Sequence, residues 1–370
     1  MALAEFRVYL NDTAATEEQL DLFREIRVDQ AIGIAAEAEL DVDLTLDDEG
    51  TWSSIEESFA QPFQRIRVEV KLGDGDFAPL IDGPIIAQRF ELGSGPGESG
   101  MTLVVHDDSV LLNMTETVQL FEDMAVHEIA ESLFGEFDLE FEVDSVPAAG
   151  STYTRYVVQR GTAMQLLRDL ARRHGMFVYV KPGEIPGHSI GVFATPSMEL
   201  GEAPELLLLG EDRNIHKFSA EFDALQPLTA RAGSVRISDK AVITSEVDAP
   251  ALTLLGDEGT HDVITTPGVS LLARTREEQN DLDAAATAAV DLSAFAYTAT
   301  AEIDANDYNT VLSPHQVISV AGPGGHLGGL YLISRVHHVI TDGGYMQTLT
   351  LKRNARSAGS DGGGLVGGVF

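Results

Sequence analysis

The sequence contains no cysteine, which excludes disulfide bonds, zinc–thiolate sites and a thiol nucleophile. No run approaches the roughly 18 consecutive apolar residues of a transmembrane helix, so we expect no membrane insertion. The first five residues, Met1–Glu5, lack the basic start and apolar core of a signal peptide. Together these absences predict a chain that is made in the cytoplasm.

Basic side chains are also scarce. The chain has 24 Lys and Arg against 59 Asp and Glu, which gives a net charge of −35. Between Phe90 and Thr154 there is no Lys or Arg at all. Such a chain repels phosphate groups, so tight nucleic-acid binding is not expected. Two explanations of the acidity stay open: a host whose proteins are all acidic, and a channel lining past which a polyanion or secreted cargo slides without sticking.

The 370 residues exceed a single ordinary core, and this length predicts two to four domains. With 44% hydrophobic residues, the chain can bury those cores. Many short alternating segments separated by Gly-rich turns, with few helical periods, predict an α+β fold that is mainly β. The expected architecture has two similar tube-like antiparallel β-barrels joined by a small α+β middle domain.

A segment near the N-terminus is similar to the stretch from Gln316 to Arg353. The stretch predicts a strand, a glycine turn, a long strand, another turn and a last strand. A shift of 246 residues superposes an earlier segment on it, and the superposed positions are Gly83 on Gly329, Arg89 on Arg335, Thr102 on Thr348 and Leu103 on Leu349. We interpret these as equivalent positions of one repeated module; two unrelated hairpin sets that share turn glycines are the alternative.

Residues 1–108 are expected to form the first barrel. The segment Arg65–Leu72 shows the clearest alternation, with aliphatic residues at every second position and charged residues between them. Within this barrel a short helix is expected after Thr16, a candidate N-cap.

Residues 109–215 are expected to form the middle domain from two strand–helix–strand units. One helix is predicted over 124–134, between an N-cap at Asp123 and a stop at Gly135. Thr162 and Gln165 form a capping box for the second helix, which Gly175 ends. The strand after the first helix should turn Phe141 inward. The helices' apolar stripes predict these core residues: Val126, Ile129, Leu133, Leu167 and Leu170.

Residues 216–355 are expected to form the second barrel. A helical insertion is predicted around 275–293, opened by a capping box of Thr275 and Glu278. Residues 356–370 form a Gly-rich tail with an apolar tip, for which both disorder and docking into a neighbour stay open.

Few residues suggest chemistry. His127–Glu128 lies on a predicted helix as in a zinc protease, but the required second histidine is replaced by Glu131. His337 and His338 are adjacent on a strand and point to opposite faces, so with the nearby His326 they make a poor metal site. We therefore predict no catalytic, cofactor-binding or metal-binding residues and no enzymatic activity.

Three segments together resemble the phage late-control D family, which forms the central hub of contractile tails and is related to the hub part of type VI secretion VgrG spikes. The segments are VHDDSVLLN with FEDMAVHEIAESL, YVVQRGTAMQLLRDLARRHGMFVYVKPG, and LYLISRVHHVITDGGYMQTLTLKRN. They occur in the family's order over about residues 100–355, whereas residues 1–95 fit by strand pattern only.

The resemblance implies a homotrimer in which two barrels per subunit make a ring of six similar units. Such a ring matches a six-fold tail tube on one side and a three-fold spike on the other. The implied partners are the tube protein, a spike on a separate chain, baseplate wedge proteins, and a tape measure or cargo in the central channel. A separate spike is expected because no spike domain follows the second barrel before Phe370.

Two other functions remain as alternatives. A soluble hydrolase would use the His127–Glu128 pair, and a tail-associated carbohydrate-binding module would bind glycans as an isolated chain. The resemblance favours the structural hub in a phage tail or a phage-like injection particle.

Overall fold

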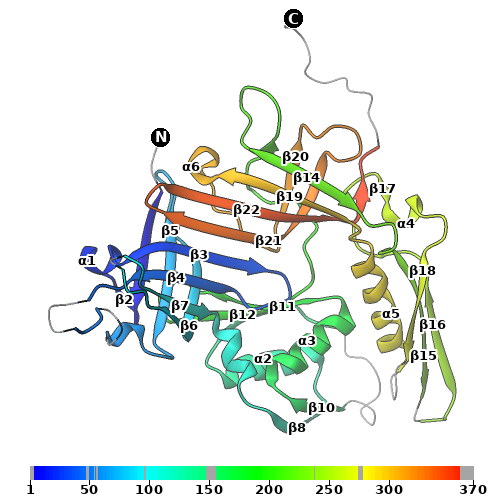
Figure 1. Cartoon of the computed structure of the whole chain (residues 1–370). Helices are drawn as coiled ribbons and strands as arrows, with labels where there is room; N and C mark the ends of the chain where they lie inside the picture. Colours follow the sequence, from blue (N-terminus) through cyan, green and yellow to red (C-terminus); the bar gives the residue numbers. More distant parts are fainter. Residues whose placement is uncertain are drawn as a thin grey trace, which may run out of the picture.

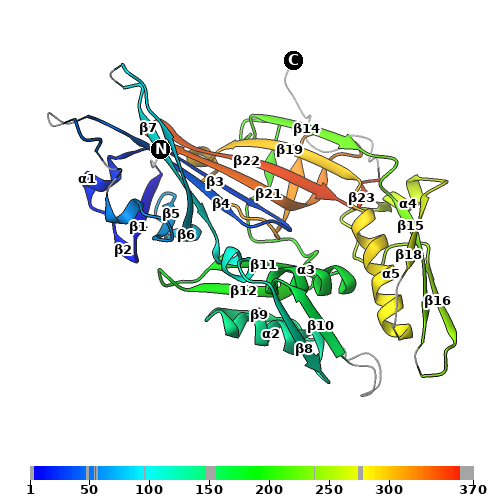
Figure 2. The same cartoon turned by 60° about the horizontal axis from the view of Figure 1, so that its bottom comes forward.

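The computed structural model describes residues 4–358 except 47–49, 54, 56, 96, 147–155, 237 and 274–277. A sheet of thirteen strands, almost entirely antiparallel, runs across the molecule (Figure 1). Two helices and two small sheets lie on one side of it, and a third small sheet with a long helix lies at one end (Figure 2). The predicted α+β, mainly β class is confirmed.

The first half of the large sheet, here called the first module, is built from the N-terminal strands. Their order is β2-β1-β5-β6-β7-β4-β3. The strands are β1 (Glu5–Leu10), β2 (Thr13–Ala14), β3 (Phe23–Ala31), β4 (Glu37–Asp43), β5 (Arg65–Lys71), β6 (Ala78–Glu91) and β7 (Gly100–His106). A short helix, α1 (Glu17–Leu20), has Thr16 as its N-cap, as predicted, and a 3-10 helix, η1 (Ser58–Ala60), precedes β5.

The second module contributes the remaining strands. They are β13 (Leu206–Leu207), β14 (Lys217–Phe222), β19 (Tyr297–Asp304), β20 (Val317–Ala321), β21 (Gly329–Thr341) and β22 (Gly344–Arg353). Their order β20-β21-β22-β19-β14 has the same connections as β5-β6-β7-β4-β3 in the first module. The short helix α6 (Ala305–Tyr308) follows β19. The two modules meet where β21 pairs with β3, so one sheet passes through both.

Side chains alternate across the large sheet as a half-buried strand requires. In β22 every second residue, from Tyr345 to Arg353, is buried, and the residues between them are partly exposed. The apolar core of the first module also includes Ile340 and Tyr345 from the second. The modules therefore share part of their hydrophobic core besides sharing the sheet.

The middle part of the chain contains two strand–helix–strand units, as expected. They are β8 (Thr117–Glu122), α2 (Val126–Glu136) and β9 (Glu140–Val143), then β10 (Tyr156–Gly161), α3 (Ala163–His174) and β11 (Phe177–Pro182). The strands exchange between units: β8 pairs with β10, while β9 and β11 both pair with β12 (Ser189–Ala194). The 3-10 helix η2 (Asp108–Asn113) leads into this part from the first module.

The helix boundaries differ in part from the prediction. Thr162 and Gln165 form their capping box and Gly175 ends α3 at a φ of 65°. For α2, Asp123 is not the N-cap; it has a φ of 55°, and Ala125 occupies the cap position. The helix also passes Gly135, because this residue keeps a helical φ and α2 ends only at Glu136.

The predicted helix-core residues lie between the helices and the sheets beneath them. Ile129, Leu133, Leu167 and Leu170 are buried in one cluster, and Val126 is partly buried against it. Phe141 is 47% exposed, so the prediction that it turns inward is wrong. Its strand, β9, lies at the edge of a three-stranded sheet, where the alternation does not show which face is covered.

The insertion in the second module is larger than the predicted helix. Helix α5 (Gln279–Ser293) packs on a separate sheet of β15 (Leu228–Val235), β16 (Val242–Val247) and β18 (Gly268–Ala273). The helix α4 (Thr260–Val263) and the pair β17 (Glu258–Gly259) and β23 (Ala355–Arg356) lie nearby. The predicted capping box is wrong, because Glu278 is itself the N-cap of α5 and its side chain makes no cap hydrogen bond. Thr275 and residues 359–370 of the predicted tail lie outside the described residues.

Candidate functional site at the junction of the modules

The seam is the antiparallel pair of Glu25–Ala31 in β3 and Arg335–Thr341 in β21. Seven residue pairs match across it, from Arg335 with Ala31 to Thr341 with Glu25. These residues are more than 300 positions apart in the sequence. The seam makes the two modules one continuous sheet and is the feature on which the architecture of the large sheet depends.

A chain of hydrogen bonds crosses the buried side of the seam. The Gln30 amide nitrogen donates to the Leu80 carbonyl oxygen at 2.6 Å, which leaves its amide oxygen to accept from His338 Nε2 at 3.3 Å. With the proton on Nε2, His338 Nδ1 accepts from the Tyr345 hydroxyl at 2.7 Å. Burial, with a smaller effect from His337, lowers the pKa of His338 to about 3. A neutral imidazole therefore connects the two modules.

Ion pairs cross the opposite, polar side of the seam. Arg335 Nε donates to Asp29 Oδ1 at 2.6 Å, and its Nη2 donates to Oδ2. Beside this pair, Arg27 contacts three carboxylates on β3 and β4 at 2.6–3.2 Å, those of Glu25, Glu39 and Asp41. The acidic side chains of this face are thus partly neutralised by arginines in the same sheet.

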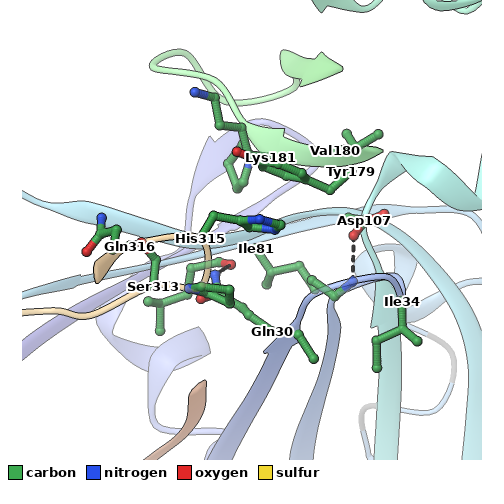
Figure 3. A pocket seen from close by; sticks show the side chains of 15 residues that line it. Gln30, Ile34, Ile81, Asp107, Tyr179, Val180, Lys181, Ser313, His315 and Gln316 are labelled. Carbon is green, nitrogen blue, oxygen red and sulfur yellow. Dashed lines mark hydrogen bonds between the residues drawn. The ribbon is translucent and has the colours of Figure 1, made fainter. Parts of the chain in front are cut away.

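A cavity of about 260 Å³ lies next to the seam, between three parts of the chain (Figure 3). The turn after β3 provides Ile34, strand β11 provides Tyr179 and Lys181, and the loop before β20 provides His315. Asp107, from the end of the first module, closes one side. The cavity marks the point at which both modules and the middle part of the chain meet.

His315 is the least ordinary residue of this cavity. Its φ is 69°, in the left-handed region that non-glycine residues rarely adopt. The ring stacks on Tyr179 with centroids 3.9 Å apart and meets Phe177 edge-on at 5.0 Å. Burial lowers the pKa of His315 to about 4, and its Nδ1 is buried without a hydrogen-bond partner. The neutral imidazole ring packs between β11 and the second module.

The two charged side chains beside the cavity, Asp107 and Lys181, already have partners within the chain. Asp107 Oδ2 accepts from Ala36 N at 2.5 Å, and its Oδ1 accepts from Ser109 N at 2.9 Å. Burial raises the pKa of Asp107 to about 6. Lys181 donates to Glu142 at 2.7 Å. Over the described residues no group of three or more His, Asp or Glu is placed to hold a metal ion. The residues around the cavity therefore connect segments of the chain to one another.

A buried ionic network attaches the middle part to the first module. Asp82 accepts from Arg65 at 2.7 Å, from Arg67 at 3.1 Å and from Gly187 N at 2.9 Å, the last in the turn between β11 and β12. Arg67 also donates to the Gly183 carbonyl oxygen at 2.8 Å. Burial raises the pKa of Asp82 against the opposing effect of Arg65. Arg67 lies on the charged face of β5, yet only 2% of its side chain is exposed because this turn covers it.

The eight predicted repeat positions lie on corresponding strands of the modules. Thr102 faces Arg89 across β6 and β7, whereas Thr348 faces His337 across β21 and β22. By strand register, Arg89 therefore corresponds to His337. The sequence shift of 246 residues had made it correspond to Arg335, two residues earlier. Leu103 and Leu349 are both fully buried. The equivalence of Gly83 with Gly329, of Thr102 with Thr348 and of Leu103 with Leu349 stays a prediction.

Gly83 gives a direct test of backbone packing at one of these positions. A Cβ atom there would lie 1.9 Å from the His106 carbonyl oxygen and 3.1 Å from Asp107 Cα. Both are backbone atoms that cannot rotate away, so we expect Gly83→Ala to lower the free energy of unfolding by about 3 kcal/mol. Gly135→Ala is the matched control, since nothing lies within 4 Å and the site is helical. A urea midpoint that falls equally for both variants would contradict the expectation.

The residues that suggested hydrolysis have local structural partners. Glu128 accepts from Ala125 N at 2.5 Å at the start of α2, and His127 Nδ1 accepts from Val146 N at 3.3 Å. His326 Nδ1 lies 2.8 Å from the Ser357 carbonyl oxygen. His338 is buried in the seam, whereas His337 lies on the polar side opposite Asp29. These histidines are not brought together.

The family model described as the Alg8 N-terminal domain matches residues 3–342. The chain belongs to the Alg8 N-terminal domain family. The match includes the first module, the middle part, the seam and the second module as far as the end of β21. No curated protein matches the chain.

Solved structures share the fold over nearly the whole chain. A tail protein from Neisseria meningitidis MC58 has a TM-score of 0.67 at 14% identity, covering 95% of this chain and 97% of that one. The 43 kDa tail protein of prophage MuSo2 from Shewanella oneidensis gives 0.66 at 14%, covering 95% and 98%. The c3393 protein of E. coli, described as a type VI secretion component similar to T4 tail proteins gp27 and gp5, gives 0.54 at 11%, covering 90% and 73%. The predicted resemblance to tail hubs is confirmed in the fold.

Neither the seam nor the ionic network around Asp82 was found from the sequence. Both join residues that are far apart along the chain, and the repeat predicted only that the two modules are alike. No helix among the described residues is long and apolar enough to cross a membrane.

Proposed function

We propose that this member of the Alg8 N-terminal domain family is the non-enzymatic central hub of a baseplate, in a contractile phage tail or a phage-like injection system. The observation that carries the proposal is the repeat of strand order, β5-β6-β7-β4-β3 and β20-β21-β22-β19-β14, within one sheet. The fold shared with two phage tail proteins and a type VI secretion component supports it.

In the proposed assembly three copies form a ring of six similar modules. Each module is a tube-like barrel wall, and the ring faces a six-fold tail tube on one side and a three-fold spike on the other. The middle part, about residues 109–215, supports the ring and meets neighbouring wedge proteins. The tube protein and a spike on a separate chain are the direct partners, and a tape measure or cargo occupies the channel.

The polar face of the large sheet is the proposed channel lining. It carries the ion pairs of the seam and of β4, where Glu39 and Asp41 bind Arg27. A net charge of −35 disfavours binding of a polyanion to such a wall. Cargo or nucleic acid would pass without tight attachment.

Native mass spectrometry tests the proposal on the full chain, alone and with the tube and spike proteins encoded beside it. We expect a complex of three copies, about three times the 39.7 kDa of one chain. A chain that stays monomeric in both conditions would overturn the proposed function. Glycan binding by the isolated chain, or hydrolysis lost in His127→Ala, would replace it with one of the alternatives.

A further inference from the structure

Several strand edges of the large sheet have no partner strand in the part of the chain that the structure describes, and two of them belong to β14 and β6. Strand β14 ends the sheet and pairs only with β19. Strand β6 pairs with β5 up to Pro84, but from Ala87 to Glu91 it pairs only with β7. Unpaired edges present rows of backbone donors and acceptors that are ready to bind another strand.

The seam already shows how such edges join. In the second module β21 continues past its contact with β20, and β3 covers the free edge. In the first module β6 continues past β5 in the same way, without a cover. Strand β14 follows β19 in the sheet order as β3 follows β4. The uncovered edge of β6 and the free edge of β14 thus correspond to the two strands of the seam.

A bulge in each module fixes the alignment. The β6–β7 ladder shifts between Ile85 and Ala87, and the β21–β22 ladder shifts between Ile333 and Arg335. Ala87 therefore corresponds to Arg335, and Arg89 to His337. Following the ladders onward through β4 and β19, the position of Asp29 corresponds to Glu221.

We propose that Ala87–Glu91 of β6 pairs antiparallel with β14 of a second copy of this chain, in the register of the seam. Arg89 then lies opposite Glu221 of the second copy, as His337 lies opposite Asp29 within one chain. Phe90 lies opposite Ala220 of the second copy. The inference rests on the proposed function, because it supplies the contact between the copies of the ring.

The side chains of the two edges fit this pairing. Arg89 is basic and Glu221 acidic, and both are exposed. Opposite charges directly across an antiparallel pair are favourable. Phe90 is 43% exposed on a strand edge of one chain, and the second strand would cover it. The two edges differ from each other, so the contact is head-to-tail and closes a ring at the right rotation.

Cysteine pairs test the register without background, because the chain has no cysteine. We expect Arg89→Cys with Glu221→Cys, and separately Phe90→Cys with Ala220→Cys, to form disulfides between chains on mild oxidation, giving a denaturing-gel ladder that ends at three copies. Directly opposed residues have Cα atoms about 4.5–5.5 Å apart, which suits a disulfide. Asp29→Cys with His337→Cys, opposed in the seam, is the matched control and should close within one chain.

A cysteine pair displaced by four residues along β14 tests the register further. Arg89→Cys with Lys217→Cys places the sulfurs four residues apart along the strand, about 13 Å, and should not cross-link. Cross-linking of this pair instead of the Glu221 pair would overturn the proposed register. A trimeric wild type in which neither opposed pair cross-links would overturn the edge contact and leave the hub intact. A wild type that never trimerises overturns the hub and the contact together.

Discussion

Asp82→Asn is expected to cost about 3–5 kcal/mol of unfolding free energy, the range found when one partner of a buried ion pair is removed. The substitution keeps the side chain's size but leaves Arg67, whose side chain is 2% exposed, without its Asp82 partner. Arg65 keeps Asp108, and Arg67 keeps Glu69, so the remaining acids offset only part of the lost charge. The urea midpoint of unfolding measures the effect.

Hydrogen exchange locates the same effect. The Gly187 amide donates to Asp82, so its exchange should accelerate in the variant, together with that of the turn from Gly183. Asp74→Asn, an exposed acid in the turn between β5 and β6, is the control and should change stability by no more than about 0.5 kcal/mol. Equal stability losses in the two variants would show that the network does not hold the middle part in place.

Acidification from pH 6.5 to pH 4 is expected to destabilise the fold through His315 and His338. Their pKa values are lowered to about 4 and about 3 from an ordinary 6.5. A lowered histidine pKa means that the unfolded chain takes up the proton first, so the stabilisation is complete above pH 6.5 and is lost as pH falls. Each histidine contributes a slope of about 1 kcal/mol per pH unit near pH 5.

Asp107 acts in the opposite direction over part of this range. Its pKa is raised to about 6, so the folded state takes up this proton first and gains stability as pH falls from 6 towards 4. This offsets roughly one of the two histidines near pH 5. The arginine-paired carboxylates Asp239 and Glu258, whose pKa values are lowered, lose their stabilisation only at lower pH.

His315→Asn isolates one histidine. Asparagine tolerates the φ of 69° but does not titrate, so the variant should lose stability at pH 7 and show a slope smaller by about 1 kcal/mol per pH unit near pH 5. Thermal unfolding at half-unit steps of pH gives both values. His337→Asn, on the polar side of the seam, is the control. An unchanged slope in His315→Asn would contradict a buried neutral imidazole at this position.

Local patterns predicted local elements well. The capping box at Thr162 and the left-handed Gly175 marked the ends of α3 because both involve contacts within a few residues. The last strand predicted in the stretch Gln316–Arg353 is β22, and one face of that strand is covered along its whole length. The ends of α2 were missed because Asp123 adopts a positive φ before the helix, which no local pattern separates from a cap.

Long-range contacts were beyond the sequence patterns. The alternation of β5 separated a charged face from an aliphatic one, but it could not show that the turn at Gly183 buries Arg67 on the charged face. Strands β15 and β16 were assigned to the second barrel, because a short strand does not show in which sheet it pairs; the two strands form a separate sheet with β18. The seam was missed for the same reason, because β3 and β21 are far apart in the sequence and no local pattern shows that they pair. The repeat predicted only that the two modules are alike.

The seam has a kinetic consequence for the proposed ring. Of the six junctions between modules in the proposed ring, three are seams within single chains. Each seam forms when its chain folds, at a rate constant that does not depend on protein concentration. Only junctions between copies require an encounter that depends on protein concentration, and two such encounters bring the three copies together before the ring closes. Tethering gives each seam an effective concentration that separate modules would not reach. A ring divided into six independent chains would need five association steps before it closed, whereas three chains need two, so many more incomplete arcs would accumulate.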